Sequence, residues 1–432
     1  MGLRSRILAV AFPAILLSYL LFWAGRGLAA PFFPDDMMNL YTAWDRPVWR
    51  LVLDLISVWN NDYRALGAIL YRIVYEMFGL QPLPYRLLCF GLLILNVWLV
   101  YRLAFALSGN EYGAWGAALV FAYHPYLSDI YMSTATIYDL ACFATFWGAV
   151  LVYRQRPSHW GVVGLGLLAM GSKEIAVSLP VLLVGVDAVL GRRPAWKIVG
   201  GVTAISLTMA AAKVAAMGRG TVVGEYVPEL SIVALMKGWK HYWGMLLYER
   251  WSHPVVVNGI LLAGLVGILL VKRAGWARLA AFAFLAIPLP VLLIAPRSLY
   301  VYYLPYAAWA LLWGNLAGRF RTPGLALALV ILSLLNWRHR PWAEEWIALD
   351  NWKVARMVEE FGRLKPARAG ERILVVDDSI PSDDWILLTT LRLARGDREL
   401  QVWRIRQLGQ PEEKEWDRRV DFKDWRLREI GN

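Results

Sequence analysis

The sequence predicts an all-α polytopic membrane protein with a small α/β domain at its C-terminal end. Of its 432 residues, 58% are hydrophobic and only 18% are charged, against about 25% charged residues in soluble domains. The mean hydropathy is +0.45. Apolar runs of about 17 residues or more recur along the chain, and each is long enough to cross a bilayer as a helix. A strand barrel would instead alternate apolar and polar positions.

The apolar runs place about eleven membrane helices in the first 337 residues. We expect them near residues 7–25, 85–107, 112–127, 133–153, 159–172, 175–191, 197–216, 254–271, 277–295, 299–317 and 323–337. These define a membrane domain over residues 1–337. Residues 26–84 form its first long loop, where DRPVWRLVLDLISVW is typical of an amphipathic helix lying on the membrane.

The basic residues predict how the chain crosses the membrane. The net charge is +12, and the excess lies in short loops such as those around Arg154, Arg192 and Lys272. Basic loops face the cytoplasm, so the N-terminus is expected inside and the first long loop outside. Anionic membrane lipids are the expected partners of these charges. Nucleic-acid binding is excluded, because no soluble basic domain is present to support it.

The C-terminal segment, residues 338–432, is predicted to be a soluble α/β domain outside the membrane. It offers a helix over 342–364, a strand at RILVVDD, a helix over 384–395 and a strand at ELQVWRI. An odd number of membrane helices places this domain on the same side as the first long loop.

An acidic pair follows the first apolar segment. Asp35 and Asp36 stand in PFFPDDMMNLY, residues 31–41. Carboxylates at the boundary of a membrane protein usually line a water-filled cavity or a site, and a pair suits base chemistry because each raises the other's proton affinity. The alternative is that the acids after Pro34 cap the next helix. Both hold if Asp35 caps and Asp36 reacts.

Further charged and polar groups gather at the predicted outer ends of the helices, which suggests a site. A tight turn is an equally good explanation for Lys173 and Glu174, and helix capping is the better one for a lone histidine before a proline. An arginine ahead of an aromatic run favours anion binding at least as much as contact with lipid headgroups. The candidates are His124, Asp129, Asp139, Lys173, Glu174, Arg297 and Tyr300.

The sequence shows no clear motif for binding a metal ion or a nucleotide cofactor. The two cysteines, Cys89 and Cys142, lie inside predicted membrane helices, so a disulfide framework or a thiolate metal site is not expected. No histidine pair at helical spacing and no phosphate-binding glycine-rich loop is present. We therefore predict no metal ligands and no nucleotide, and the need for a divalent metal ion stays open.

Four segments in this order resemble the GT-C class of membrane glycosyltransferases, in the branch of protein O-mannosyltransferases and ArnT-like enzymes. They are PDDMMNLY, HPYLSDIYMSTATIYDLACFATFWGAVLVY, GSKEIAVSLP and PRSLYVYYLP. The chain lacks the tetratricopeptide repeats of the part of that branch whose segments it matches, so acceptor recognition does not transfer. The resemblance implies a polyprenyl-phosphate sugar donor and a bacterial inner-membrane protein whose active site and C-terminus face the periplasm.

The implied reaction assigns roles to the candidates. One of Asp35 and Asp36 removes the acceptor proton while the acceptor oxygen attacks the anomeric carbon. Arg297 and Lys173, with His124 as a weaker choice, stabilise the leaving lipid phosphate. A single displacement with one base predicts inversion at the anomeric carbon.

Two other functions fit parts of the sequence. A polytopic lipid or sugar transporter, or flippase, would use the same charges as a translocation path, although no repeated halves or broken helices are evident. A non-catalytic membrane subunit would present the C-terminal domain to partners.

Overall fold

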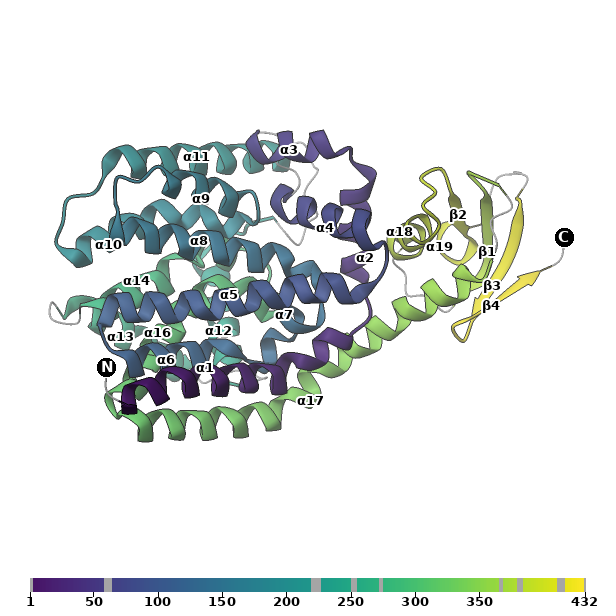
Figure 1. The fold of residues 1–432 in the computed structure, drawn as a ribbon. Helices are drawn as coiled ribbons and strands as arrows, with labels where there is room; N and C mark the ends of the chain where they lie inside the picture. Colours follow the sequence, from purple (N-terminus) through teal and green to yellow (C-terminus); the bar gives the residue numbers. More distant parts are fainter. Residues whose placement is uncertain are drawn as a thin grey trace.

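The computed structural model describes residues 3–57, 64–218, 227–249, 255–271, 275–364, 368–378, 384–409 and 416–430. Helices run side by side in a bundle, and one long helix leads out of the bundle to a small sheet domain (Figure 1). A mostly helical membrane protein with a small C-terminal α/β domain was predicted, and this coarse description is confirmed.

The first fifth of the chain forms one outer helix and the first long loop. α1 (Leu3–Ala24) leads through a 3₁₀ turn, η1 (Gly25–Ala29), into the short loop helices. These are α2 (Pro34–Asp45), α3 (Val48–Ile56) and α4 (Ala65–Phe78). The acidic pair lies in the first turn of α2.

The rest of the bundle follows in chain order. The helices are α5 (Pro82–Ser108), α6 (Glu111–Ala122), α7 (Ser128–Met132), α8 (Ile137–Gln155), α9 (Gly161–Met170), α10 (Leu179–Leu190), α11 (Trp196–Gly218), α12 (Ile232–Leu246), α13 (Val255–Leu270), α14 (Trp276–Ala286), α15 (Leu289–Leu292) and α16 (Tyr303–Arg319). Short 3₁₀ turns separate some of them: η3 (Pro125–Leu127), η4 (Thr134–Thr136), η5 (Glu174–Ser178) and η8 (Leu299–Tyr302).

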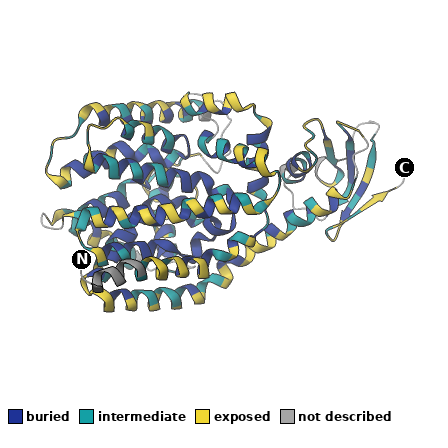
Figure 2. Cartoon of the chain, in the orientation of Figure 1, coloured by how far each residue is buried: buried dark blue, intermediate teal, exposed yellow. Residues whose placement is uncertain are grey.

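Four segments of the described chain are long and apolar enough to cross a membrane: Ala11–Ala29, Pro82–Ser108, Thr134–Gln155 and Trp196–Ala215. Each of the predicted ranges overlaps a helix, but several of these helices are shorter, so a count of eleven crossings is not confirmed. Exposed positions follow the outward faces of the outer helices (Figure 2). Large apolar side chains such as Leu327, Val330 and Leu334 are among them, as expected for a surface in contact with lipid.

Glycines let α6 and α16 approach each other backbone to backbone. A Cβ atom built on Gly116 would lie 2.6 Å from the carbonyl oxygen of Gly314, and Cβ atoms on Gly314 and Gly318 would overlap the backbone of α6. Small residues at such positions drive helix association in membranes, where no hydrophobic force acts between helices. The two helices therefore form a tightly packed centre of the bundle.

α17 (Arg321–Gly362) joins the bundle to the C-terminal domain as one helix of 42 residues. The expected domain division between residues 337 and 338 falls inside it. Figure 1 shows α17 bending on its way out of the bundle, and Pro341 lies inside the helix. A proline in a helix interior removes a backbone hydrogen bond and favours a bend.

The C-terminal sheet has the strand order β2-β1-β3-β4. β1 (Arg372–Asp378) is parallel to β2 (Gln401–Arg404) and to β3 (Arg418–Lys423), and β4 (Arg426–Ile430) is antiparallel to β3. Two helices, α18 (Asp384–Arg395) and α19 (Ile405–Leu408), complete the domain.

The C-terminal domain is attached to the helix that carries the acidic pair. Arg392 donates a hydrogen bond to the Tyr41 hydroxyl at 2.6 Å, and Arg398 donates one to the Trp44 carbonyl at 2.7 Å. The Arg398 guanidinium also stacks over the Trp44 ring, 4.7 Å from its centroid. These contacts fix α2 against α18 from the side opposite the bundle.

The glycine contact between α6 and α16 gives a first prediction. Gly314→Ala should destabilise the protein strongly, because the added methyl group would overlap the Ala117 backbone, whereas Gly91→Ala in α5 meets nothing within 4 Å. In an open helix position that change stabilises by about 0.5–1 kcal/mol. Thermal unfolding of both variants in the same lipid nanodisc checks this; an equal melting temperature for the two would contradict the packing.

Candidate active site

A cavity of about 650 Å³ lies where the first loop, the bundle and the C-terminal domain meet. Its volume falls within the range of about 300–1,000 Å³ usual for small-molecule sites. The lining residues come from segments far apart in the sequence. They are Phe33, Pro34, Asp35, Asp129, Ala295, Pro296, Arg297, Ser298, Tyr300, Trp346, Asp350, Lys353, Met357, Ile386 and Trp425.

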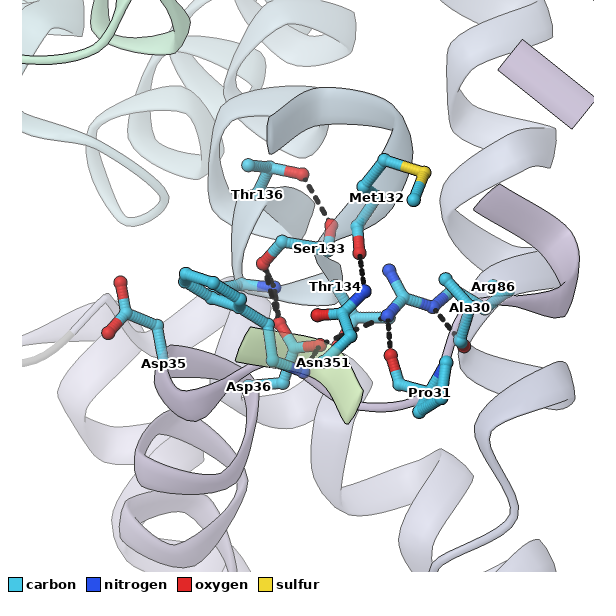
Figure 3. Close-up of polar contacts among 12 residues, drawn as sticks. Ala30, Pro31, Asp35, Asp36, Arg86, Met132, Ser133, Thr134, Thr136 and Asn351 are labelled. Atoms are coloured by element: carbon cyan, nitrogen blue, oxygen red, sulfur yellow. Dashed lines mark hydrogen bonds and ion pairs between the residues drawn. The ribbon is translucent and has the colours of Figure 1, made fainter. Parts of the chain in front are cut away.

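The two acids of the pair point in different directions (Figure 3). Asp35 faces the cavity, away from the polar network that surrounds its neighbour. Asp36 is fully buried. Consecutive residues of a helix are about 100° apart around its axis, so one acid faces the cavity while the other faces the protein. The sequence allowed Asp35 to cap the helix, whereas in the structure the carboxylate that caps it is that of Asp36.

Asp36 ties the start of α2 to the bundle through both carboxylate oxygens. Its Oδ1 accepts hydrogen bonds from the Ser133 hydroxyl and the Ala135 amide, both at 2.6 Å. Its Oδ2 accepts from the Phe33 amide at 2.8 Å, which caps the helix, and from the Arg86 guanidinium at 3.3 Å. Both carboxylate oxygens of Asp36 are therefore occupied by protein donors, and these contacts hold the start of α2 against the bundle.

Three more candidates reach the cavity. Asp129 lies in the first turn of α7, and Arg297 and Tyr300 lie around the loop between α15 and η8. The loop is supported from α12, since His241 Nε2 lies 2.6 Å from the Arg297 carbonyl oxygen. Burial raises the pKa of the Asp129 carboxyl to about 7, and the nearby charge of Asp35 adds to this effect. Two carboxyl groups, a guanidinium group and a phenol ring thus share one cavity.

Lys173, Asp139 and Glu174 form a charged layer behind the cavity wall. Lys173 makes an ion pair with Asp139, and its ammonium group lies 4.7 Å from the centroid of the Tyr300 ring. Burial lowers the pKa of Lys173. Glu174 lies 3.4 Å from each of Arg64 and Lys213, and against the effect of burial these cations hold its pKa below the usual range.

His124 lies apart from the cavity lining. It is buried, its Nδ1 accepts a hydrogen bond from the Tyr126 amide at 3.3 Å, and its Nε2 lies 3.4 Å from the Leu246 carbonyl oxygen. The imidazole therefore caps the turn η3, as the alternative for a histidine before a proline predicts.

Sequence reasoning did not single out the far wall of the cavity. Trp346, Asp350, Lys353 and Met357 come from α17, and Ile386 and Trp425 come from the C-terminal domain. The spacing of four, three and four places the α17 residues on one helix face. The pattern is present in the sequence, but the domain division expected at residue 337 separates this helix face from the membrane domain. Within the described ranges, no group of three or more His, Cys, Asp or Glu side chains is arranged to hold a metal ion.

The chain was compared with known protein families, sequences and structures. No protein-family model matches the chain. Protein O-mannosyl-transferase Tmtc1 of Drosophila melanogaster is 30% identical over 151 residues, which are 33% of this chain and 18% of that protein. The chain therefore spans less than a fifth of this curated relative. ArnT from Cupriavidus metallidurans, crystallised with undecaprenyl phosphate, has a TM-score of 0.57 at 13% identity and covers 97% of both chains. Its apo structure gives a TM-score of 0.38.

The fold is thus the one seen in ArnT. The predicted resemblance to the GT-C class, in its ArnT and protein O-mannosyltransferase branch, is confirmed by one structural and one sequence match. The ArnT likeness covers the C-terminal region as well as the bundle, since it extends over almost the whole chain.

Asp36→Asn should lower the melting temperature, because an amide cannot accept hydrogen bonds with both of its terminal atoms and would leave buried donors unpaired, at a cost of about 1–3 kcal/mol. Asp35→Asn, at the neighbouring position and facing the cavity, should leave it unchanged. Thermal unfolding of the two variants and of wild type, followed by fluorescence in nanodiscs, measures the difference. A larger loss for Asp35→Asn would contradict the anchoring role of Asp36.

The raised pKa of Asp129 predicts that the stability of the fold depends on pH. Its raised pKa means that the folded protein binds the proton more tightly than the unfolded chain does, so stability falls as pH rises from about 4 to about 7. Asp129→Asn should unfold like wild type near pH 4 and at a higher temperature than wild type at pH 8. The exposed Asp45→Asn variant of α2 is the control. Parallel melting curves for Asp129→Asn and wild type at every pH would show that the pKa is not raised.

Proposed function

We propose that this protein is a membrane glycosyltransferase that moves a sugar from a polyprenyl-phosphate carrier to an acceptor on the outer, periplasmic or lumenal, side of the membrane. The observation that supports it most is that Asp35 and Arg297 line one cavity in a GT-C fold. The lipid chain of the donor stays in the bilayer, and its phosphate and sugar enter the cavity from the membrane surface.

Asp35 is the proposed general base. Its carboxylate takes the proton of the acceptor hydroxyl while the freed oxygen attacks the anomeric carbon of the donor. The bond between that carbon and the phosphate oxygen breaks, and polyprenyl phosphate leaves with the electron pair. One displacement with one base inverts the anomeric centre. Asp36 supports this step only indirectly, by holding α2 in place.

Arg297 is the proposed partner of the leaving phosphate. A guanidinium pairs with phosphate oxygens through two parallel hydrogen bonds, and it stabilises charge that develops during bond cleavage. Lys173 already pairs with Asp139 behind Tyr300, and His124 lies outside the lining. We therefore assign the phosphate contact to Arg297 and a supporting electrostatic role to Lys173.

Asp35→Asn should reduce the rate of sugar transfer by about 10²–10⁴-fold, the usual contribution of a general base, with an unchanged melting temperature. The assay follows transfer of labelled mannose or glucose from undecaprenyl phosphate to membrane acceptors. Asp45→Asn, which removes an exposed acid from the same helix, is the matched control and should keep wild-type activity. Full activity of Asp35→Asn would exclude Asp35 as the base.

A further inference from the structure

The cavity has two chemically different walls. One wall, from the first loop, α7 and the segment around Arg297, holds the groups of the proposed transfer reaction. The other comes from α17 and the C-terminal domain, and it contains two tryptophans, Trp346 and Trp425, together with the charged pair Asp350 and Lys353. The proposed transfer step leaves this second wall without a role.

Trp425 has a backbone conformation that is unfavourable for a bulky residue. It is the second residue of the two-residue turn between β3 and β4, and both turn residues have positive φ angles, 49° at Asp424 and 61° at Trp425. Turns of this kind favour Asn, Asp or Gly, and a bulky residue at positive φ is uncommon and unfavourable. Such conformations cluster at ligand-binding sites, where the surrounding structure holds them.

Neighbouring contacts fix the turn and its ring. The Leu427 amide donates a hydrogen bond to the Glu360 carboxylate of α17 at 3.1 Å. The Trp425 ring meets those of Trp352 and Phe422 edge-on, with centroids 5.6 and 5.7 Å apart. Trp425 is only partly buried by these contacts and also lines the cavity. A rigid aromatic surface is thus presented to the cavity.

Polar groups stand on the same wall. Lys353 Nζ lies 2.7 Å from Asp350 Oδ1, and both side chains keep about a quarter of their surface exposed, 23% and 30%. A pyranose ring has an apolar face of C–H groups and a rim of hydroxyls. An aromatic surface matches the face, and a carboxylate with an ammonium group matches the rim as acceptor and donor.

We propose that Trp425, with Asp350 and Lys353, forms a binding subsite for a pyranose ring at the C-terminal wall of the cavity. The inference deepens the proposed glycosyl transfer and rests on it for its biological meaning. The ring belongs either to the sugar of the lipid-linked donor or to a saccharide acceptor. Both would present a pyranose ring to Trp425, and a competition experiment distinguishes the donor sugar from the acceptor.

The test is saturation-transfer NMR on the full chain in lipid nanodiscs, with methyl α-mannopyranoside and methyl β-glucopyranoside as probes. Trp425→Asn keeps a residue suited to positive φ and removes the ring, so binding of the preferred glycoside should weaken about tenfold. Trp425→Tyr should restore most of the affinity. Trp403→Ala in β2, outside the cavity lining, is the matched control and should bind as wild type does.

Competition identifies the source of the ring. Undecaprenyl-phosphate mannose or glucose displaces the methyl glycoside if the subsite holds the donor sugar, and leaves it bound if the subsite holds a saccharide acceptor. Either result supports the subsite. Sorbitol, an open-chain polyol without a ring face, should not compete.

Several results would overturn the subsite. They are the absence of glycoside binding to wild type, equal binding by Trp425→Asn, or binding of a Ser/Thr-rich peptide at Trp425 in place of the glycosides. Asp35→Asn separates this test from the proposed function, since it should bind glycoside normally while transfer is lost. Retained transfer by Asp35→Asn would overturn the proposed base and leave the binding result standing.

Discussion

The buried Asp36 carboxylate is the interaction on which the arrangement of the cavity depends. It gathers donors from the start of its own helix, from the segment before α8 and from Arg86 of α5. An unpaired charge at that depth would be very costly, so the buried carboxylate depends on these donors. Once Asp36 is fixed, helical geometry turns Asp35 toward the cavity. The buried Asp36 thereby determines that the exposed Asp35 faces the cavity.

The cavity is shared between parts of the chain that look independent in sequence. α2 is held from one side by the bundle and from the other by Arg392 and Arg398 of the C-terminal domain. α17 continues without a break from the bundle to that domain and supplies one wall on its way. The C-terminal domain is thus part of the cavity itself, and the polar side of the bundle forms only half of the enclosure.

The sequence predicted those features that depend on local patterns. Apolar runs located the helices, and β1, α18 and β2 fall in the segments where a strand, a helix and a strand were expected. The sequence also singled out Asp35, Asp129, Arg297 and Tyr300 as candidate site residues, and all four line the cavity. It could not divide roles within the acidic pair, because the direction of each side chain depends on Ser133 and Arg86, distant partners that no local pattern reveals. Trp425 was not predicted as a site residue for the same reason, because only the fold places the β3–β4 turn beside the cavity.

Pro341 sets the course of the helix that forms one wall of the cavity. It has no amide hydrogen to donate to the preceding turn of α17, and it stands just before the stretch of that helix that lines the cavity. Beyond the bend, α17 stays attached to the bundle, because the Ser128 hydroxyl donates a hydrogen bond to the Ala343 carbonyl at 3.0 Å and the Asn351 amide donates one to the Met132 carbonyl at 3.2 Å. The width of the chamber is therefore built into the course of α17, since the bend sets the direction in which Trp346 and Lys353 face the first loop.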